Sequence, residues 1–129
     1  PYFLEKQFTG VDSAYFTLVQ DAMQAVVEQT GGTARRGRID SISVCGKTGT
    51  VQNKLTPDHS VFIAFAPRED PKIAIAVYVE DAGFGGTWAA PIASLMMEKY
   101  ITGEVKRPEK EKRILEANFI DVEDKDEEE

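Results

Sequence analysis

Residues 42–51, Ile-Ser-Val-Cys-Gly-Lys-Thr-Gly-Thr-Val, decide how the rest of this chain is organised. The first half of the stretch alternates apolar and small residues, which predicts a β-strand. Side chains alternate between the two faces of a strand, so Thr48 and Thr50 share one face and Lys47 takes the other. The two glycines leave room for another backbone or a ligand to approach closely. This composition predicts an edge strand with one side open to a ligand.

Two further strands are expected after it. Residues 60–66 and 72–80 are apolar on both alternating faces, which predicts interior strands that are covered on both sides. The links between the three strands are short, polar and contain proline. Such links favour an antiparallel meander.

A helix is expected on each side of the meander. The first begins near Asp12 or Ser13, which are good N-caps, and ends at the glycine pair 31–32. Its apolar residues at three- and four-residue spacing form one stripe that should face the core: Phe16, Val19, Met23, Val26 and Val27. The second helix begins near Ala90 and ends at Gly103. The predicted class is α+β: a helix, a three-stranded antiparallel meander and a C-terminal helix.

The 129 residues, 42 % of them hydrophobic, are enough for one domain or part of one. The formal charge of −7 is uneven, because residues 104–129 carry 11 acids and 6 bases while the body is close to neutral. We therefore divide the chain into a folded part, 1–103, and a charged acidic tail, 104–129. The last eight residues are nearly all acidic and should be disordered.

Several classes of function are disfavoured. No basic stripe with interleaved aromatics predicts nucleic-acid binding, and the pair Arg35-Arg36 is interpreted as a loop anchor. No run of about 20 apolar residues predicts a membrane span, and no signal peptide is visible. The single histidine, His59, and the single cysteine, Cys45, lack the spacing of metal ligands, so no metal is expected. A structural role, capping the second strand, is favoured for His59.

Two nucleotide-binding motifs fail on context, so no cofactor is expected. Gly46-Lys47-Thr48 suggests a P-loop, but Ser41 stands where that motif needs glycine and no helix follows. Gly83 and Gly85 suggest a dinucleotide fingerprint, but Trp88 replaces its third glycine and the strands are antiparallel. A hinge loop is the favoured interpretation there.

The lysine-threonine-glycine box at residues 47–49 is one of three sequence boxes of penicillin-binding proteins and serine β-lactamases. Further segments stand in the order and spacing of that family: 32–36, 46–52, 59–67, 71–74 and 89–93. Residues 13–103 thus resemble the C-terminal end of the transpeptidase domain of class B penicillin-binding proteins, in particular the cell-elongation type, penicillin-binding protein 2. The resemblance implies a partial penicillin-binding/serine β-lactamase-like transpeptidase fold.

The resemblance also implies roles for the strand residues. Lys47 would hold the hydrogen-bond network of the active-site hydroxyls. Thr48 and Thr50, with Gly49 between them, would bind the carboxylate of a β-lactam or of the D-Ala-D-Ala stem peptide. The backbone N–H of Thr50 would supply one oxyanion-hole donor, which makes Lys47 and Thr50 the expected catalytic residues. The peptide would lie along the strand edge as an added strand.

The sequence departs from the family at the nucleophile. The nucleophile box is Ser-x-x-Lys, and the residues three positions after the five serines are Phe16, Val44, Gly46, Ile63 and Met97. No Ser-x-Asn box is present either. We therefore expect a fragment of a serine D,D-transpeptidase that is inactive by itself. The alternative is a stand-alone α/β interaction module that binds peptides at the strand edge.

The same resemblance implies partners and a location. The parent would cross-link peptidoglycan stem peptides through an acyl-serine, bind β-lactams, and be anchored at the periplasmic face of the bacterial inner membrane. No anchor is expected within the fragment itself. Its strand 72–80 would lack two neighbouring strands of the domain, so the fragment is expected to self-associate.

Overall fold

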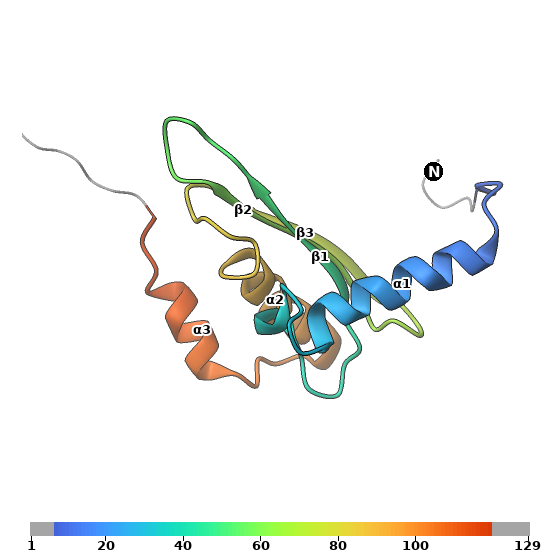
Figure 1. The fold of residues 1–129 in the computed structure, drawn as a ribbon. Helices are drawn as coiled ribbons and strands as arrows, with labels where there is room; N and C mark the ends of the chain where they lie inside the picture. The colour runs from blue at the N-terminus through green and yellow to red at the C-terminus, as the bar shows by residue number, and fades with distance from the viewer. Residues whose placement is uncertain (1–6, 120–129) are drawn as a thin grey trace, which may run out of the picture.

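The computed structural model describes residues 7–119. Figure 1 shows a twisted three-stranded sheet with helices packed beside it. In chain order the elements are α1 (Ser13–Glu28), the 3-10 turn η2 (Arg35–Gly37), β1 (Cys45–Val51), β2 (His59–Ala66), β3 (Ile73–Val79), α2 (Ala89–Thr102) and α3 (Pro108–Leu115). The predicted α+β order of helix, antiparallel meander and helix is confirmed, and α3 follows it.

The sheet has the order β1-β2-β3, and both pairs of strands are antiparallel. Thr48 lies opposite Phe62, which lies opposite Val77, and this row faces the core that α2 covers. Lys47 and Ile63 belong to the next row, on the opposite face. The two faces of β1 therefore carry different chemistry.

The core lies between the sheet and α2. Its largest fully buried side chains include Phe62, Met97, Val27 and Val44. A Cβ atom on Gly46 would lie 2.7 Å from one ring atom of Phe62 and closer still to another. Glycine at position 46 thus lets the central strand place an aromatic ring directly beneath β1.

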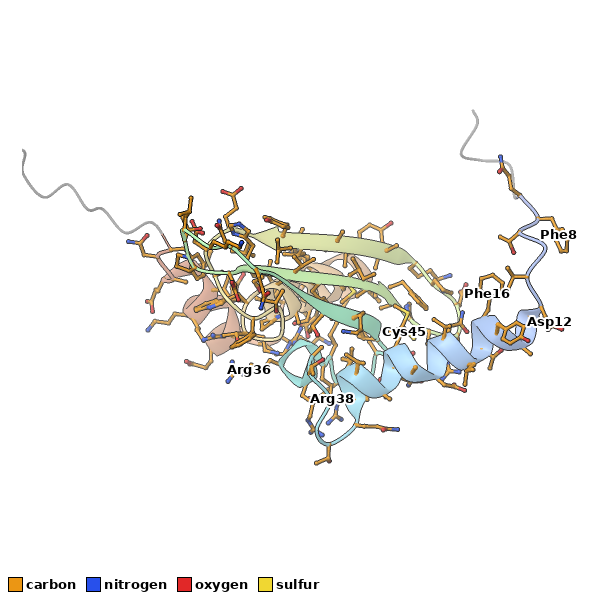
Figure 2. The ribbon with its side chains drawn as sticks, turned by 45° about the horizontal axis from the view of Figure 1, so that its top comes forward. Phe8, Asp12, Phe16, Arg36, Arg38 and Cys45 are labelled. Atoms are coloured by element: carbon orange, nitrogen blue, oxygen red, sulfur yellow. The ribbon has the colours of Figure 1, made fainter. Side chains whose placement is uncertain are left out.

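Helix α1 begins as predicted, because the Asp12 carboxylate accepts a hydrogen bond from the Ala14 N–H at 2.8 Å. The prediction that its whole apolar stripe faces the core is wrong. Phe16 and Val19 are 47 % and 55 % exposed, whereas Val27 is fully buried. Figure 2 shows Phe16 on the half of α1 that projects beyond the sheet. Only the C-terminal half of the helix has core residues to pack against.

The strands differ from prediction in two respects. The first strand begins at Cys45 rather than at residue 42, because a left-handed residue, Ser41, forms a turn just before it. Full cover on both faces of β2 and β3 is also wrong, because Ile63 and Tyr78 are about half exposed. Within residues 7–119, β3 pairs with β2 alone and its other edge is open.

Helix α3 forms inside the stretch that we assigned to the charged tail. Pro108 stands in its first turn, where a missing N–H costs no hydrogen bond. The acidic end of the tail and the expectation that it is disordered lie outside the described residues. No helix among residues 7–119 has the length and apolarity to cross a bilayer.

Candidate functional site

The candidate site is a cleft of about 480 Å³ beside β1. Thr48 and Thr50 line it from one face of the strand, and two other segments, 32–36 and 84–87, complete it. The lining residues are Gly32, Thr33, Arg35, Arg36, Thr48, Thr50, Phe84, Gly85, Gly86 and Thr87. The cleft thus combines four threonines and two arginines with glycine backbone, a composition suited to an anionic, peptide-like ligand.

The Thr48 hydroxyl lies 2.9 Å from the Thr33 hydroxyl, so the two share a hydrogen bond. This bond ties the loop after α1 to the middle of β1. Because a hydroxyl both donates and accepts, each side chain keeps hydrogen-bonding capacity for a ligand. The hydrogen bond to Thr33 therefore orients the Thr48 side chain and leaves its hydroxyl able to bind a ligand.

Lys47 lies on the opposite face of β1 from Thr48 and Thr50, as the strand alternation predicted. It is exposed, and its Nζ donates a hydrogen bond to the Thr48 carbonyl oxygen at 2.7 Å. The ammonium is therefore held near the strand backbone, outside the lining of the cleft. The predicted site residues occupy one strand but two faces of it.

The close approach predicted at the strand glycines is made by the chain itself. A Cβ atom on Gly85 would lie 2.5 Å from the Gly49 carbonyl oxygen, and one on Gly86 would overlap with the Thr33 carbonyl oxygen. The loop between β3 and α2 can therefore lie against β1 only with glycine at position 85, and against the loop after α1 only with glycine at position 86. We interpreted this loop as a hinge from the sequence. In the structure it also forms a wall of the cleft.

Sequence reasoning also missed part of the opposite wall. Arg35 does anchor its loop, because its Nη1 donates to the Glu28 carbonyl oxygen and the Thr30 hydroxyl at 3.4 and 3.3 Å. The sequence interpretation as a loop anchor covers Arg36 too, and it misses that both arginines line the cleft. The one sequence signal for this wall was the glycine-threonine pair at 32–33, inside the first family segment.

Cys45 opens β1 but has no place in the cleft chemistry. The thiol is buried, and burial raises its pKa above the ordinary value for cysteine. Its Sγ lies 3.4 Å from the Gln20 carbonyl oxygen, which ties β1 to α1. A buried thiol held in its neutral form is a packing residue.

His59 stands away from the cleft, at the base of the β1–β2 loop. Its Nδ1 accepts a hydrogen bond from the Asp81 N–H at 3.0 Å, and its ring packs against Tyr78. The residue thus joins the start of β2 to the end of β3, in line with the structural role predicted for it. Among residues 7–119 no cluster of three or more His, Cys, Asp or Glu residues could hold a metal ion.

Comparison with known proteins places this geometry in a family. Residues 4–98 match the penicillin-binding protein transpeptidase domain. The peptidoglycan D,D-transpeptidase PbpA of Mycolicibacterium smegmatis is 45 % identical over 69 residues, which cover 46 % of this chain and 14 % of the relative. The peptidoglycan D,D-transpeptidase MrdA of Haemophilus influenzae is 34 % identical over 104 residues, 68 % of this chain and 16 % of the relative. The chain thus spans a small part of these enzymes.

Solved structures agree with the sequence relatives. PBP2 of Pseudomonas aeruginosa, in complex with WCK 5153, aligns with a TM-score of 0.64 and 35 % identity over 75 % of this chain and 22 % of its own. Penicillin-binding protein A of M. tuberculosis, as a ceftriaxone acyl-enzyme complex, aligns with a TM-score of 0.63 and 30 % identity over 75 % of this chain and 23 % of its own. The chain therefore belongs to the family of penicillin-binding protein transpeptidase domains.

Proposed function

We propose that this chain forms one wall of the active site of a peptidoglycan D,D-transpeptidase that also binds β-lactams. The observation that carries the proposal is the position of Thr48 and Thr50, side by side in a cleft on the strand with the family's lysine-threonine-glycine box. Relatives named peptidoglycan D,D-transpeptidases support the reaction class. Structures of penicillin-binding protein A as β-lactam acyl-enzymes support the ligand class.

In this proposal each strand residue has one task. The hydroxyls of Thr48 and Thr50 bind the carboxylate of the stem peptide or of a β-lactam, with the flat backbone of Gly49 between them. The Thr50 N–H donates to the oxyanion of the tetrahedral intermediate, where loss of one donor costs about two to three powers of ten in rate. Lys47 adds positive charge and organises the active-site hydroxyls from the other face.

The substrate peptide adds to the edge of β1. Within the described residues β1 pairs with β2 alone, so one row of its backbone N–H and C=O groups has no partner strand. An extended peptide pairs with such an edge through main-chain hydrogen bonds, and the side-chain pockets give specificity. The cleft beside Thr48 supplies such a pocket.

The nucleophile comes from outside these 129 residues, because no serine in the sequence has lysine three residues later. The chain alone is then inactive toward β-lactams. The complete enzyme acts at the periplasmic face of the inner membrane, where its substrate lies, held by an anchor outside this chain.

Acylation of the full-length protein by a labelled penicillin tests the proposal. Lys47→Ala should lower the second-order acylation rate by about a hundredfold or more, as loss of an active-site proton-transfer network does. Lys54→Ala is the matched control, because Lys54 is exposed in the loop just after β1. Equal rates for both variants, or no acylation of the wild-type protein, would overturn the proposal.

The 129-residue chain gives the complementary test. Intact-protein mass spectrometry after incubation with the same penicillin should show no adduct. An acyl adduct in stoichiometric amount would show that the chain holds its own nucleophile.

A further inference from the structure

Helix α3 and Arg107, the residue before it, direct three cationic side chains toward the rest of the molecule. Arg107, Lys110 and Arg113 recur every third residue, so they lie near one another on one side of the helix. Each donates a hydrogen bond to a backbone carbonyl oxygen of another segment. This helix contacts the body through charge and has no fully buried residue of its own.

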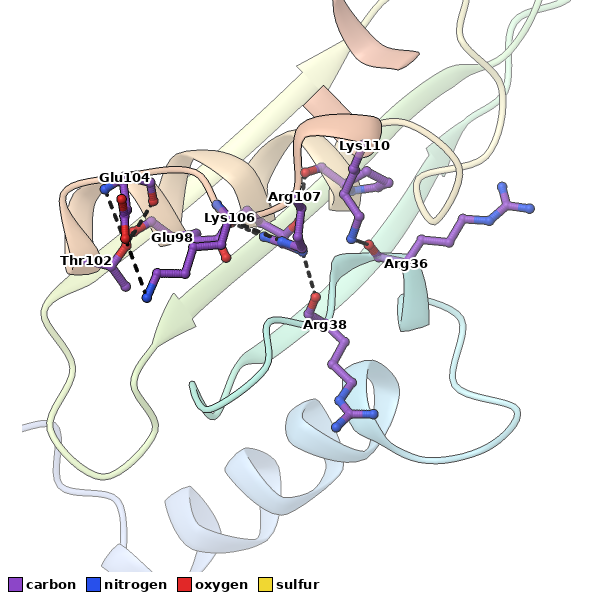
Figure 3. Close-up of polar contacts among 10 residues, drawn as sticks. Arg36, Arg38, Glu98, Thr102, Glu104, Lys106, Arg107 and Lys110 are labelled. Carbon is purple, nitrogen blue, oxygen red and sulfur yellow. Dashed lines mark hydrogen bonds and ion pairs between the residues drawn. The ribbon is translucent and has the colours of Figure 1, made fainter. Parts of the chain in front are cut away.

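Two of these contacts hold the turn η2. The Lys110 Nζ donates to the Arg36 carbonyl oxygen at 2.6 Å, and the Arg107 Nη1 donates to the Arg38 carbonyl oxygen at 2.7 Å. Figure 3 shows both contacts, one to Arg36 within the turn and one to Arg38 just after it. Because η2 carries Arg35 and Arg36 into the cleft, α3 fixes one cleft wall from behind.

The third cation holds the opposite wall. Arg113 donates to the Thr87 carbonyl oxygen at 3.3 Å, and its guanidinium lies 4.1 Å from the centre of the Trp88 ring. Phe119 packs edge-on against the same ring at 4.7 Å between centroids. These contacts fix the end of the loop whose glycines lie flat on β1.

An ion pair between Arg107 and the buried Glu98 of α2 attaches these residues to the body of the molecule. The Arg107 Nε lies 3.1 Å from Glu98 Oε2, and Glu98 is 4 % exposed. Arg107 also donates to the carbonyl and hydroxyl oxygens of Ser94 at 3.0 and 3.2 Å. Removing one partner of such a pair leaves an uncompensated buried charge, so the attachment resists opening.

We propose that Arg107 and α3 form a brace that holds both cleft walls in register with β1, with Lys110 and Arg113 as positioning residues. The brace begins at residue 107, outside the residues 4–98 that match the family domain. The inference rests on the proposed function, because it treats the cleft as part of the active site. Misplacing a reacting group by about 1 Å can cost about a hundredfold in rate, so a brace remote from the strand affects the reaction.

The test compares brace variants with a control on the same helix. In the full-length protein, Lys110→Met combined with Arg113→Gln removes one contact to each wall and leaves Arg107 in place. Lys112→Met removes an exposed lysine that pairs with Glu116 at 3.9 Å. The measurements are the acylation rate constant and dissociation constant for a labelled penicillin, the melting temperature, and amide hydrogen exchange of residues 35–38 and 84–88.

We expect faster exchange in both segments and an acylation rate constant lowered by about tenfold or more in the double variant. The Lys112→Met control should match the wild type. The single variant Lys110→Arg should keep the wild-type rate constant, because arginine also donates to a carbonyl oxygen. A helix that only stabilises the fold would lower the melting temperature and leave exchange and rate constants unchanged at lower temperatures, and this result would overturn the brace.

Failure of the brace and failure of the proposed function give different results. A wild-type protein that is not acylated contradicts the proposed function, while faster exchange in the double variant still supports the brace. If the double variant does not fold, Arg113→Lys replaces it, because lysine keeps the charge but loses the planar stacking on Trp88. Unchanged exchange at 84–88 in that variant contradicts the brace.

Discussion

The backbone of Gly85 lies directly on the backbone of Gly49, so close that a Cβ atom on Gly85 would be 2.5 Å from the Gly49 carbonyl oxygen. Two segments separated by 36 residues thus share a contact that only glycine permits. This contact seats on β1 the segment Phe84–Thr87, which lines one side of the cleft.

Gly85→Ala should therefore destabilise the chain by about 1–3 kcal/mol, the usual cost of overpacking against atoms that cannot move aside. Gly49→Ala is a matched comparison, because its Cβ would meet the Val61 Cβ at 3.3 Å, a tightness that a small shift between the two strands relieves. Urea denaturation measures both. An equal loss of unfolding free energy in the two variants would contradict the rigid contact at Gly85.

The hydrogen bond between the hydroxyls of Thr33 and Thr48 predicts energetic coupling. Thr33→Val, Thr48→Val and the double variant form a cycle in which valine keeps the shape and removes the hydroxyl. We expect a coupling energy of about 1 kcal/mol in unfolding free energy. Additive effects of the two single variants would show that the bond contributes nothing.

Lys110 should titrate at an unusually low pH. Burial lowers its pKa to about 8, and the neighbouring positive charge of Arg107 acts in the same direction. Carbon-13 NMR of the dimethylated lysines gives the midpoint directly. Arg107→Gln should raise this pKa and Glu98→Gln should lower it, because these charges act on it in opposite senses. A midpoint near 10.5 in the native protein would be inconsistent with a half-buried Lys110 beside Arg107.

The same shift makes stability depend on pH. Between pH 8 and 10.5 the folded Lys110 has lost its proton while the unfolded side chain keeps it, so the unfolded state binds more protons. The contribution of Lys110 to unfolding free energy therefore rises with pH across that window. Lys110→Met should remove this rise, measured by urea denaturation at a series of pH values.

The open edge of β3 predicts self-association of the 129-residue chain. Alternate side chains on this strand are exposed, and no strand pairs with its outer edge within residues 7–119. Light scattering at micromolar concentration should show dimers or larger species. Ala76→Lys places a charge on the exposed edge and should shift the chain toward monomer, whereas Gln52→Lys in the hairpin loop should not. A wild-type monomer at these concentrations would contradict the prediction.

Local periodicity explains what the sequence predicted well. The alternation of a strand placed Thr48 and Thr50 on one face and Lys47 on the other, and this follows from backbone geometry alone. The start of α1 followed from Asp12, whose carboxylate caps the helix by accepting a hydrogen bond from the N–H of Ala14, two residues later. Such features depend on neighbours in the chain and need no tertiary information.

The misses depend on contacts between distant segments. The stripe of α1 shows which face would pack, but the exposure of Phe16 depends on where the sheet ends. The loop at Phe84–Thr87 became a cleft wall because it lies on β1, a contact that its glycines suggested but did not locate. The spacing of the bases in α3 was hidden within a stretch whose acidic composition dominated its interpretation.

The division of β1 into two unlike faces limits the shape of any ligand that uses all of its polar groups. Thr48 and Thr50 line the cleft, while the Lys47 ammonium is bonded to the Thr48 carbonyl oxygen, outside that lining. A rigid, flat molecule seated in the cleft would meet the hydroxyls and miss the ammonium. A molecule that reaches both must bend around the rim of the strand, so curvature would distinguish among ligands of equal charge.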